Sequence, residues 1–155
     1  MDNLNKSEKG FTEEHAKRLN ESFKKWIGHD LIPLQADKSL LDQLYHSETI
    51  ILSHGTEVDP VLNFGNQAAL TLWETDKEDF IKTPSRLTAE PMERAERARF
   101  FEEVTANGFV NNYTGIRISS TGKRFYIKQA IVWNIIDDNN NYYGQAATFS
   151  EYEYI

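Results

Sequence analysis

The spacing of apolar residues divides the chain into a helical N-terminal part and a longer part rich in strands. Apolar side chains recur at i, i+4, i+7 and i+8 through residues 19–27, which is the spacing of one helix face. Thr12 is suited to cap the start of this helix, and Gly28 is suited to end it. We predict a second, shorter helix over residues 39–46. The polar residues 1–10 are expected to form a flexible tail, so residues 11–47 form an N-terminal helical extension.

The remaining residues, 48–155, carry the pattern of one domain. Alternation of apolar and polar residues predicts two short strands (49–53 and 61–64) and three long ones (109–119, 124–136 and 142–152). Helices are predicted over residues 67–74 and 92–107, the second with Ala95, Ala98, Phe101 and Val104 on its buried face. This order predicts the α+β class, a five-stranded antiparallel sheet with helices packed on one face.

Five sequence segments carry a family resemblance. They are Asp59–Glu74, Thr83–Pro91, Glu96–Phe125, Ala130–Asp137 and Gly144–Phe149, and they contain PSRLTAEP, YTGIRISSTGKRF and GQAATF. In this order they resemble the MEKHLA family, a PAS-like group that includes stand-alone bacterial proteins and the C-terminal domain of plant class III homeodomain–leucine zipper transcription factors. The printed sequence contains no homeodomain or leucine zipper, so we expect the stand-alone bacterial type.

The resemblance implies a PAS-like fold and a sensory or regulatory role. It brings no catalytic residues with it. For the plant members the associated role is regulation of dimerisation, which transfers to this chain only as a hypothesis.

A PAS-type fold binds small molecules between the inner face of the sheet and the helices. The strand at 124–136 predicts an inner face of Phe125, Ile127, Gln129, Ile131 and Trp133. Gln129 and Gln145 are polar residues at strand positions whose neighbours on the same face are apolar. Each therefore either contacts a ligand or forms structural hydrogen bonds. The candidate ligand-binding residues are Trp73, Arg86, Phe101, Tyr113, Arg117, Gln129, Trp133 and Gln145.

Two of these candidates are arginines with two readings each. Arg117 shares a strand parity with Tyr113, so both face solvent if Ile116 and Ile118 face the core. A bulge would reverse this phase and bring Arg117 into the cavity as a donor to a carboxylate or phosphate. Alternatively, Arg117 or Arg86 forms a salt bridge to Glu74 or Glu90, which is the reading that we favour.

Composition removes several classes of function. The 155 residues contain 17 Lys and Arg against 24 Asp and Glu, a net charge of −7, which disfavours nucleic acid and anionic membranes as partners. The absence of cysteine excludes cysteinyl–flavin photochemistry and disulfides. No histidine falls on the predicted helix 92–107, where a haem-binding PAS sensor would be expected to carry its axial ligand, so haem is not expected. The histidine spacings match no metal site. Arg94, Arg97 and Arg99 alternate with glutamates, which indicates a solvated helix face.

Three functions therefore remain open. The first is a sensory domain with a small-molecule ligand but no identified cofactor. The second is a ligand-free interaction module that forms a homodimer through its N-terminal helix. The third, a small enzyme of the isomerase or cyclase type, is disfavoured because no acidic residue occupies the apolar phase of the strand at 124–136. Residues 1–10 lack the apolar stretch of a signal peptide, so a cytoplasmic location is expected.

Overall fold

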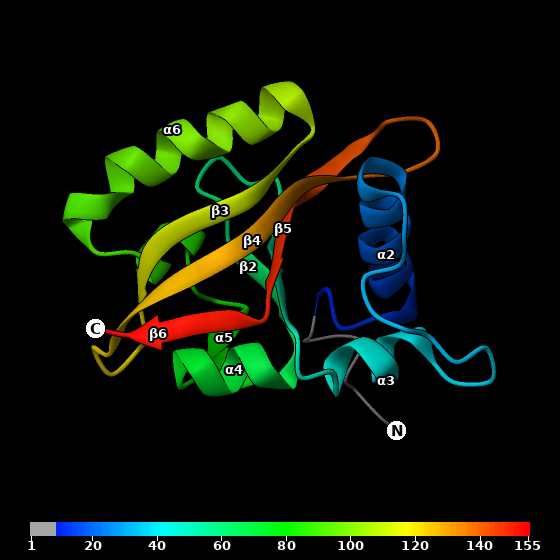
Figure 1. The fold of residues 1–155 in the computed structure, drawn as a ribbon, viewed down its shortest axis with the longest axis horizontal. Coiled ribbons are helices and arrows are strands. Elements are labelled where there is room, and N and C mark those ends of the chain that lie inside the picture. The colour runs from blue at the N-terminus through cyan, green and yellow to red at the C-terminus, as the bar shows by residue number, and fades with distance from the viewer. Residues whose placement is uncertain (1–8) are drawn as a thin grey trace.

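One antiparallel sheet organises the fold (Figure 1). In the computed structural model, which describes residues 9–155, five strands lie in the order β2-β1-β5-β4-β3. Their bounds are Ile50–His54 (β1), Leu62–Gly65 (β2), Phe109–Ile118 (β3), Arg124–Ile136 (β4) and Tyr142–Phe149 (β5). The predicted α+β class and the five predicted strands are therefore confirmed. Most of the predicted tail, residues 1–8, lies outside the described residues.

A sixth strand, β6 (Glu151–Tyr154), extends the sheet beyond the prediction. The predicted strand 142–152 is interrupted at Ser150, which is a bend. β5 pairs with β4 only along Ile131–Ile136, so the N-terminal half of β4 is left for β6, which pairs with Phe125–Lys128. The long strand β4 thus has two different neighbours on one edge.

Helices cover both faces of the sheet. The helices α4 (Gln67–Trp73), α5 (Lys77–Phe80) and α6 (Pro91–Asn107) and the 3₁₀ turn η1 (Ser85–Thr88) follow β2 in the chain. The helices α2 (Glu13–Ile27) and α3 (Leu40–Tyr45) precede β1. Phe23 of α2 packs edge-on against Trp133, whereas Trp73 of α4 packs against Phe125 in a separate core cluster. The N-terminal helix therefore packs on its own sheet, on the face opposite to α4. No helix within residues 9–155 has the length and apolar character needed to cross a membrane.

A β-bulge in β4 overturns the predicted inner face. Gln129 adopts a positive φ of 51° and is exposed, and the pairing register with β3 shifts next to it. Because one extra residue reverses the alternation, Ala130 takes the side of Phe125 and Ile127, and Trp133 takes the opposite side. The prediction that Gln129, Ile131 and Trp133 share a face with Phe125 was wrong for this reason.

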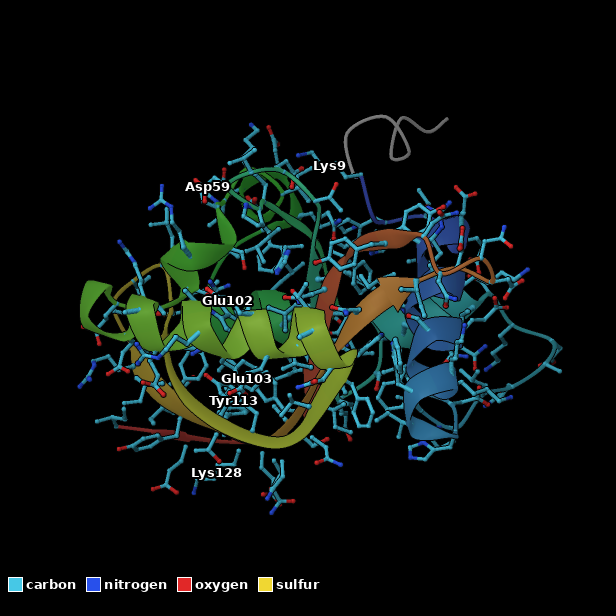
Figure 2. The ribbon with its side chains drawn as sticks, turned by 90° about the horizontal axis from the view of Figure 1, so that it is seen from above. Lys9, Asp59, Glu102, Glu103, Tyr113 and Lys128 are labelled. Atoms are coloured by element: carbon cyan, nitrogen blue, oxygen red, sulfur yellow. The ribbon has the colours of Figure 1, made fainter. Side chains whose placement is uncertain are left out.

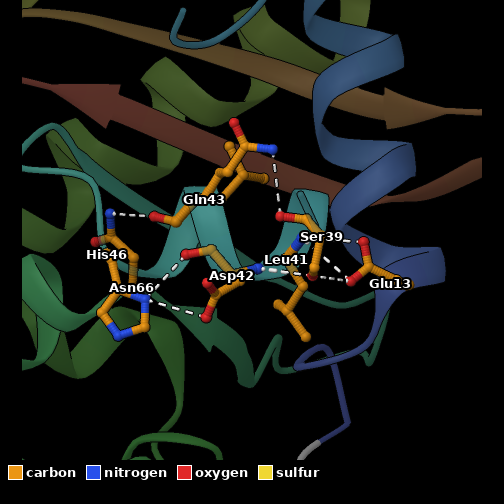
Figure 3. Close-up of polar contacts among 8 residues, drawn as sticks. Glu13, Ser39, Leu41, Asp42, Gln43, His46 and Asn66 are labelled. Carbon is orange, nitrogen blue, oxygen red and sulfur yellow. Dashed lines mark hydrogen bonds and ion pairs between the residues drawn. The ribbon is translucent and has the colours of Figure 1, made fainter. Parts of the chain in front are cut away.

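Polar contacts join the N-terminal helices to the sheet (Figure 3). Glu13 at the start of α2 accepts hydrogen bonds from the Ser39 hydroxyl and the Leu41 amide at the start of α3. Asn66 is fully buried and caps α4 by accepting from the Ala69 amide. Its amide group donates to the carbonyls of Leu44 and Thr49, at 3.0 and 2.7 Å. These bonds fix α3, β1 and α4 relative to one another.

Helix α6 covers the sheet with a face that only partly matches the predicted one, because Phe101 and Val104 face inward and Ala95 and Ala98 do not. Seen from above, it lies across the sheet, with Glu102 and Glu103 on the helix and Tyr113 of β3 beside it (Figure 2). Ala95 and Ala98 are exposed, contrary to the prediction, and only Val104 is fully buried. The inward face is formed by Arg97, Phe101 and Val104, spaced i, i+4 and i+7.

Candidate functional site

A cavity lies between the sheet and the layer formed by α4, η1 and α6. The space inside it that is open to the centres of water molecules is about 40 Å³. Its apolar wall consists of Leu52, Ile127, Val132 and Phe149. A second hollow of about 450 Å³ adjoins it, and the two share His54, Ser85, Arg97, Phe101 and Gln145. These shared side chains form the partition between the inner cavity and the wider hollow.

Arg117 enters the cavity from β3. Its side chain is buried, and its guanidinium donates to the Ile116 carbonyl at 2.8 Å and to the Tyr113 hydroxyl at 3.2 Å. The Tyr113 ring stacks on Phe100 of α6 at 3.8 Å. Arg117 pairs across the sheet with Phe125, so it shares the inner face. Of the two readings of Arg117, the cavity position is the one that the structure shows.

Arg97 reaches the same cavity from α6. Its guanidinium donates to the Ser85 hydroxyl and lies 4.5 Å from the centre of the Phe101 ring. Its Nε is buried and has no hydrogen-bond partner. Burial, followed by the positive charge of Arg117, lowers the pKa of Arg97 to about 9, so the side chain stays charged at neutral pH. Among the described residues, neither Arg97 nor Arg117 has a carboxylate partner.

Trp73 provides a second polar group without a hydrogen-bond partner among the described residues. Its indole ring packs edge-on against Phe125 and Phe149, with ring centres 5.2 and 6.3 Å apart, and its Nε1 is buried without an acceptor. The other two indoles are satisfied: Trp26 donates to the Asn134 carbonyl, and Trp133 donates to the Ser22 hydroxyl. The unpaired indole N–H is therefore specific to the cavity wall.

Gln145 links the cavity wall to α6. Its side-chain nitrogen lies 2.9 Å from the Thr105 hydroxyl, 3.3 Å from the Phe101 carbonyl and 3.0 Å from the Asn134 side-chain oxygen. Asn134 in turn donates to the Val104 carbonyl at 3.1 Å. The structural reading of Gln145 is the one that these bonds support. Two buried amides thus hold the C-terminal half of α6 on the sheet.

The adjacent residues Ser53 and His54 point to opposite faces of β1, as their alternation predicts. Ser53 faces α2, where its hydroxyl lies 2.9 Å from Nε2 of His15. His54 lines the cavity, and burial lowers the pKa of its imidazole. A side chain at Gly144, where φ is 125°, would collide with the carbonyl oxygen of His54, so glycine lets β1 and β5 lie close together here.

Five predicted site residues come together at the cavity, and three do not. The five are Trp73, Phe101, Tyr113, Arg117 and Gln145. Gln129 is exposed at the bulge, and Trp133 packs against α2 on the other face. Arg86 is exposed at the rim of the wider hollow.

The favoured salt bridges of the arginines were also wrong. Arg86 pairs with Asp59, at 3.2 Å. Glu74 and Glu90 are occupied by Lys123 and Arg124.

Arg97 is the main site residue that sequence reasoning missed. The alternation of arginine and glutamate from residue 93 to 99 predicts a solvated face, and Arg99 does form an exposed ion pair with Glu96. Arg97, however, lies four residues before Phe101 and seven before Val104, on the face that meets the sheet. This spacing is the signal that would have separated Arg97 from its neighbours.

Comparison with known proteins places these features in a family. The MEKHLA domain model matches residues 13–154. Homeobox-leucine zipper protein ATHB-9 of Arabidopsis thaliana is 31% identical over 119 residues, which cover 76% of this chain and 14% of that protein. Homeobox-leucine zipper protein REVOLUTA of the same plant is 24% identical over 147 residues, 90% of this chain and 18% of that protein. The chain therefore spans less than a fifth of the length of these relatives.

Solved structures agree on the fold. The PAS domain of a protein from Colwellia psychrerythraea superposes with a TM-score of 0.61 at 15% identity, covering 74% of this chain and 92% of that chain. The dark structure of the blue-light photoreceptor Aureochrome1 LOV gives a TM-score of 0.55 at 13% identity, covering 80% and 88%. The sheet with its helical cover is PAS-like, and the chain belongs to the MEKHLA domain family.

Proposed function

We propose that this chain is a sensory domain that binds a small molecule in the cavity between the sheet and α6. The observation that carries the proposal is the buried Nε1 of Trp73, which has no acceptor in a cavity that has room for one. An unsatisfied buried donor costs about 1–3 kcal/mol, and a bound molecule with an acceptor would recover that cost. A mostly apolar wall with a few unpaired polar groups is typical of small-molecule sites.

The response that we propose is a shift of α6. This helix contributes Arg97 and Phe101 to the cavity, while Gln145 and Asn134 hold its C-terminal half. A bound molecule that contacts Arg97 stabilises one position of the helix and so changes the population of its conformations. The exposed face of α6, which includes Glu102 and Glu103, is the surface on which that change is displayed.

The test is native mass spectrometry of the purified protein beside its denatured mass. We expect additional mass that is lost on denaturation. Ala147 lines the cavity from β5, so Ala147→Leu places a larger side chain inside and should abolish the additional mass. Ala95→Leu makes the same change on the exposed face of α6 and should leave it intact.

The contrary result is that neither the original chain nor Ala95→Leu carries additional mass, and that no compound in a library of small neutral and charged molecules stabilises the original chain. That outcome would favour the ligand-free interaction module. The apolar face of α2 is buried on its own sheet here, so a homodimer through that helix requires it to detach. Sedimentation velocity on the same sample measures whether a dimer forms.

A further inference from the structure

The charged groups of the cavity indicate the chemical class of its ligand. Arg97 and Arg117 enter from opposite walls, α6 and β3, and both are close enough for the charge of one to affect the other. Within the described part of the chain, no Asp or Glu lines the inner cavity. A buried and a partly buried positive charge without a counter-ion repel each other and lack part of the hydration that they would have in water.

Each guanidinium still has donor capacity to offer. A guanidinium carries five N–H groups, and the fork that they form matches the two oxygens of a carboxylate. Arg117 uses donors on the Ile116 carbonyl and the Tyr113 hydroxyl, and Arg97 uses one on Ser85. The Nε of Arg97 and the indole N–H of Trp73 are both buried and unpaired. The cavity therefore has a surplus of hydrogen-bond donors and of positive charge.

The rest of the sheet face that lines the cavity is apolar and limits the ligand further. Leu52, Ile127 and Val132 offer no hydrogen bonds from their side chains, so a phosphate would leave its outer oxygens unsatisfied against them. A short hydrocarbon tail would fill the same space favourably. The space open to the centres of water molecules is about 40 Å³, which is room for a few water-sized groups, so the ligand is small.

We propose that the cavity binds a short-chain carboxylate, with its carboxylate on Arg97, Arg117 and the Trp73 indole and its hydrocarbon tail on the apolar wall. This inference rests on the proposed function and deepens it. The bound anion would neutralise the repulsion between the two arginines, and it would draw Arg97 of α6 toward Arg117 of the sheet. The charge of the ligand and the position of α6 are thereby coupled.

The chain contains internal reporters for a test by NMR. Propionate is titrated into the isotope-labelled protein, with its neutral isostere propionamide and with inorganic phosphate as separate arms. We expect propionate to shift the indole N–H resonance of Trp73 with saturation. The indoles of Trp26 and Trp133 already have acceptors outside the cavity and should not move. We expect propionamide to have no effect and phosphate to bind more weakly than propionate.

Arginine variants assign the carboxylate to its partners. Arg97→Gln and Arg117→Gln should each weaken propionate binding by roughly tenfold or more, because each removes a charge-assisted hydrogen bond. Arg99→Gln removes the same charge from an exposed position on the same helix and should not change the affinity. If Arg117→Gln does not fold, Arg97→Gln carries the test, and the comparison of propionate with propionamide needs no variant.

Several outcomes would overturn the inference. Equal binding of propionamide, tighter binding of phosphate, or unchanged affinity in both arginine variants would each contradict a carboxylate on the two arginines. In those cases a small molecule still binds, so the proposed function stands. If no probe moves Trp73, the co-purified molecule from native mass spectrometry decides, and one without a carboxylate overturns the inference alone. A protein that carries no bound molecule and that no compound of the library stabilises overturns both the inference and the proposed function.

Discussion

The contact between Trp133 and α2 gives a quantitative test of the bulge in β4. Trp133 is fully buried, its ring centre lies 4.9 Å from that of Phe23 in an edge-on geometry, and its indole donates to Ser22 at 3.1 Å. Truncation of a buried tryptophan to alanine costs about 3–5 kcal/mol. Of this, the aromatic pair contributes about 1 kcal/mol and the hydrogen bond about 1 kcal/mol, and the remainder comes from burial of the ring.

A double-mutant cycle separates this contact from burial in general. Trp133→Ala, Phe23→Leu and the double variant are unfolded in urea, and the free energies are extrapolated to water. We expect Phe23→Leu to cost about 0.5–1.5 kcal/mol less when Trp133 is already absent. As a control, Phe23→Leu combined with Trp73→Leu joins opposite faces of the sheet and should be additive within about 0.5 kcal/mol.

Additive effects of Phe23 and Trp133, together with coupling between Trp133 and Phe125, would refute the reasoning. Such a result would place Trp133 on the cavity face and remove the phase reversal at Gln129. Trp133→Phe keeps an aromatic ring and loses the bond to Ser22 and part of the buried ring, so it provides a milder variant for the same cycle.

Three further predictions concern stability. Burial lowers the pKa of His15 from 6.5 to about 4, so as the pH falls the unfolded chain protonates this histidine before the folded chain does. The free energy of unfolding should therefore be highest above pH 6.5 and fall by up to about 3 kcal/mol as the pH is lowered to 4; unfolding measured against pH should show this slope, and His15→Gln should reduce it. Asn66→Ala removes a cap and leaves buried backbone groups unpaired, so chemical denaturation should show a loss of about 3 kcal/mol. Asn66→Asp keeps the cap but sets a buried carboxylate against the carbonyls of Leu44 and Thr49, so it should lose at least as much. Deletion of residues 1–30 uncovers Trp133, so thermal unfolding should show a strongly destabilised sheet, and a truncated protein of unchanged melting temperature would contradict the packing of α2.

The elements of the fold were predictable because each has a local signal. Thr12 does cap α2, Gly28 does end it in a left-handed conformation, and the strands fall within a few residues of the predicted ranges. The reversal at Gln129 was not predictable, because residues 132–136 of β4 are all buried and, apart from Asn134, apolar, so no clear alternation reveals the phase of the strand. The bend at Ser150 depends on which neighbour each half of β4 has, which is a property of the whole sheet.

The candidate site was predictable only in part. Aromatic and amide residues in apolar phases indicated Trp73 and Gln145, since such residues stand out against their neighbours. The orientation of Arg117 depended on irregular pairing between β3 and β4, which no periodicity shows. Arg97 looked like its charged neighbours, although its spacing of four and seven residues from Phe101 and Val104 places it on their face of the helix.

The bulge at Gln129 also sets the phase of β4 so that consecutive residues of this strand contact the cavity on one face and α2 on the other. Val132 lines the cavity, and the next residue, Trp133, supports α2 on the far side. If a ligand in the cavity displaces Val132, the adjacent Trp133 moves with it and changes the contact with the N-terminal helix, without an intervening loop. By thermodynamic reciprocity, any factor by which occupancy of the cavity strengthens the docking of α2 is the factor by which detachment of α2 weakens the cavity's affinity. If the proposed function holds, whatever holds or releases the N-terminal helix therefore changes the ligand concentration at which the cavity fills.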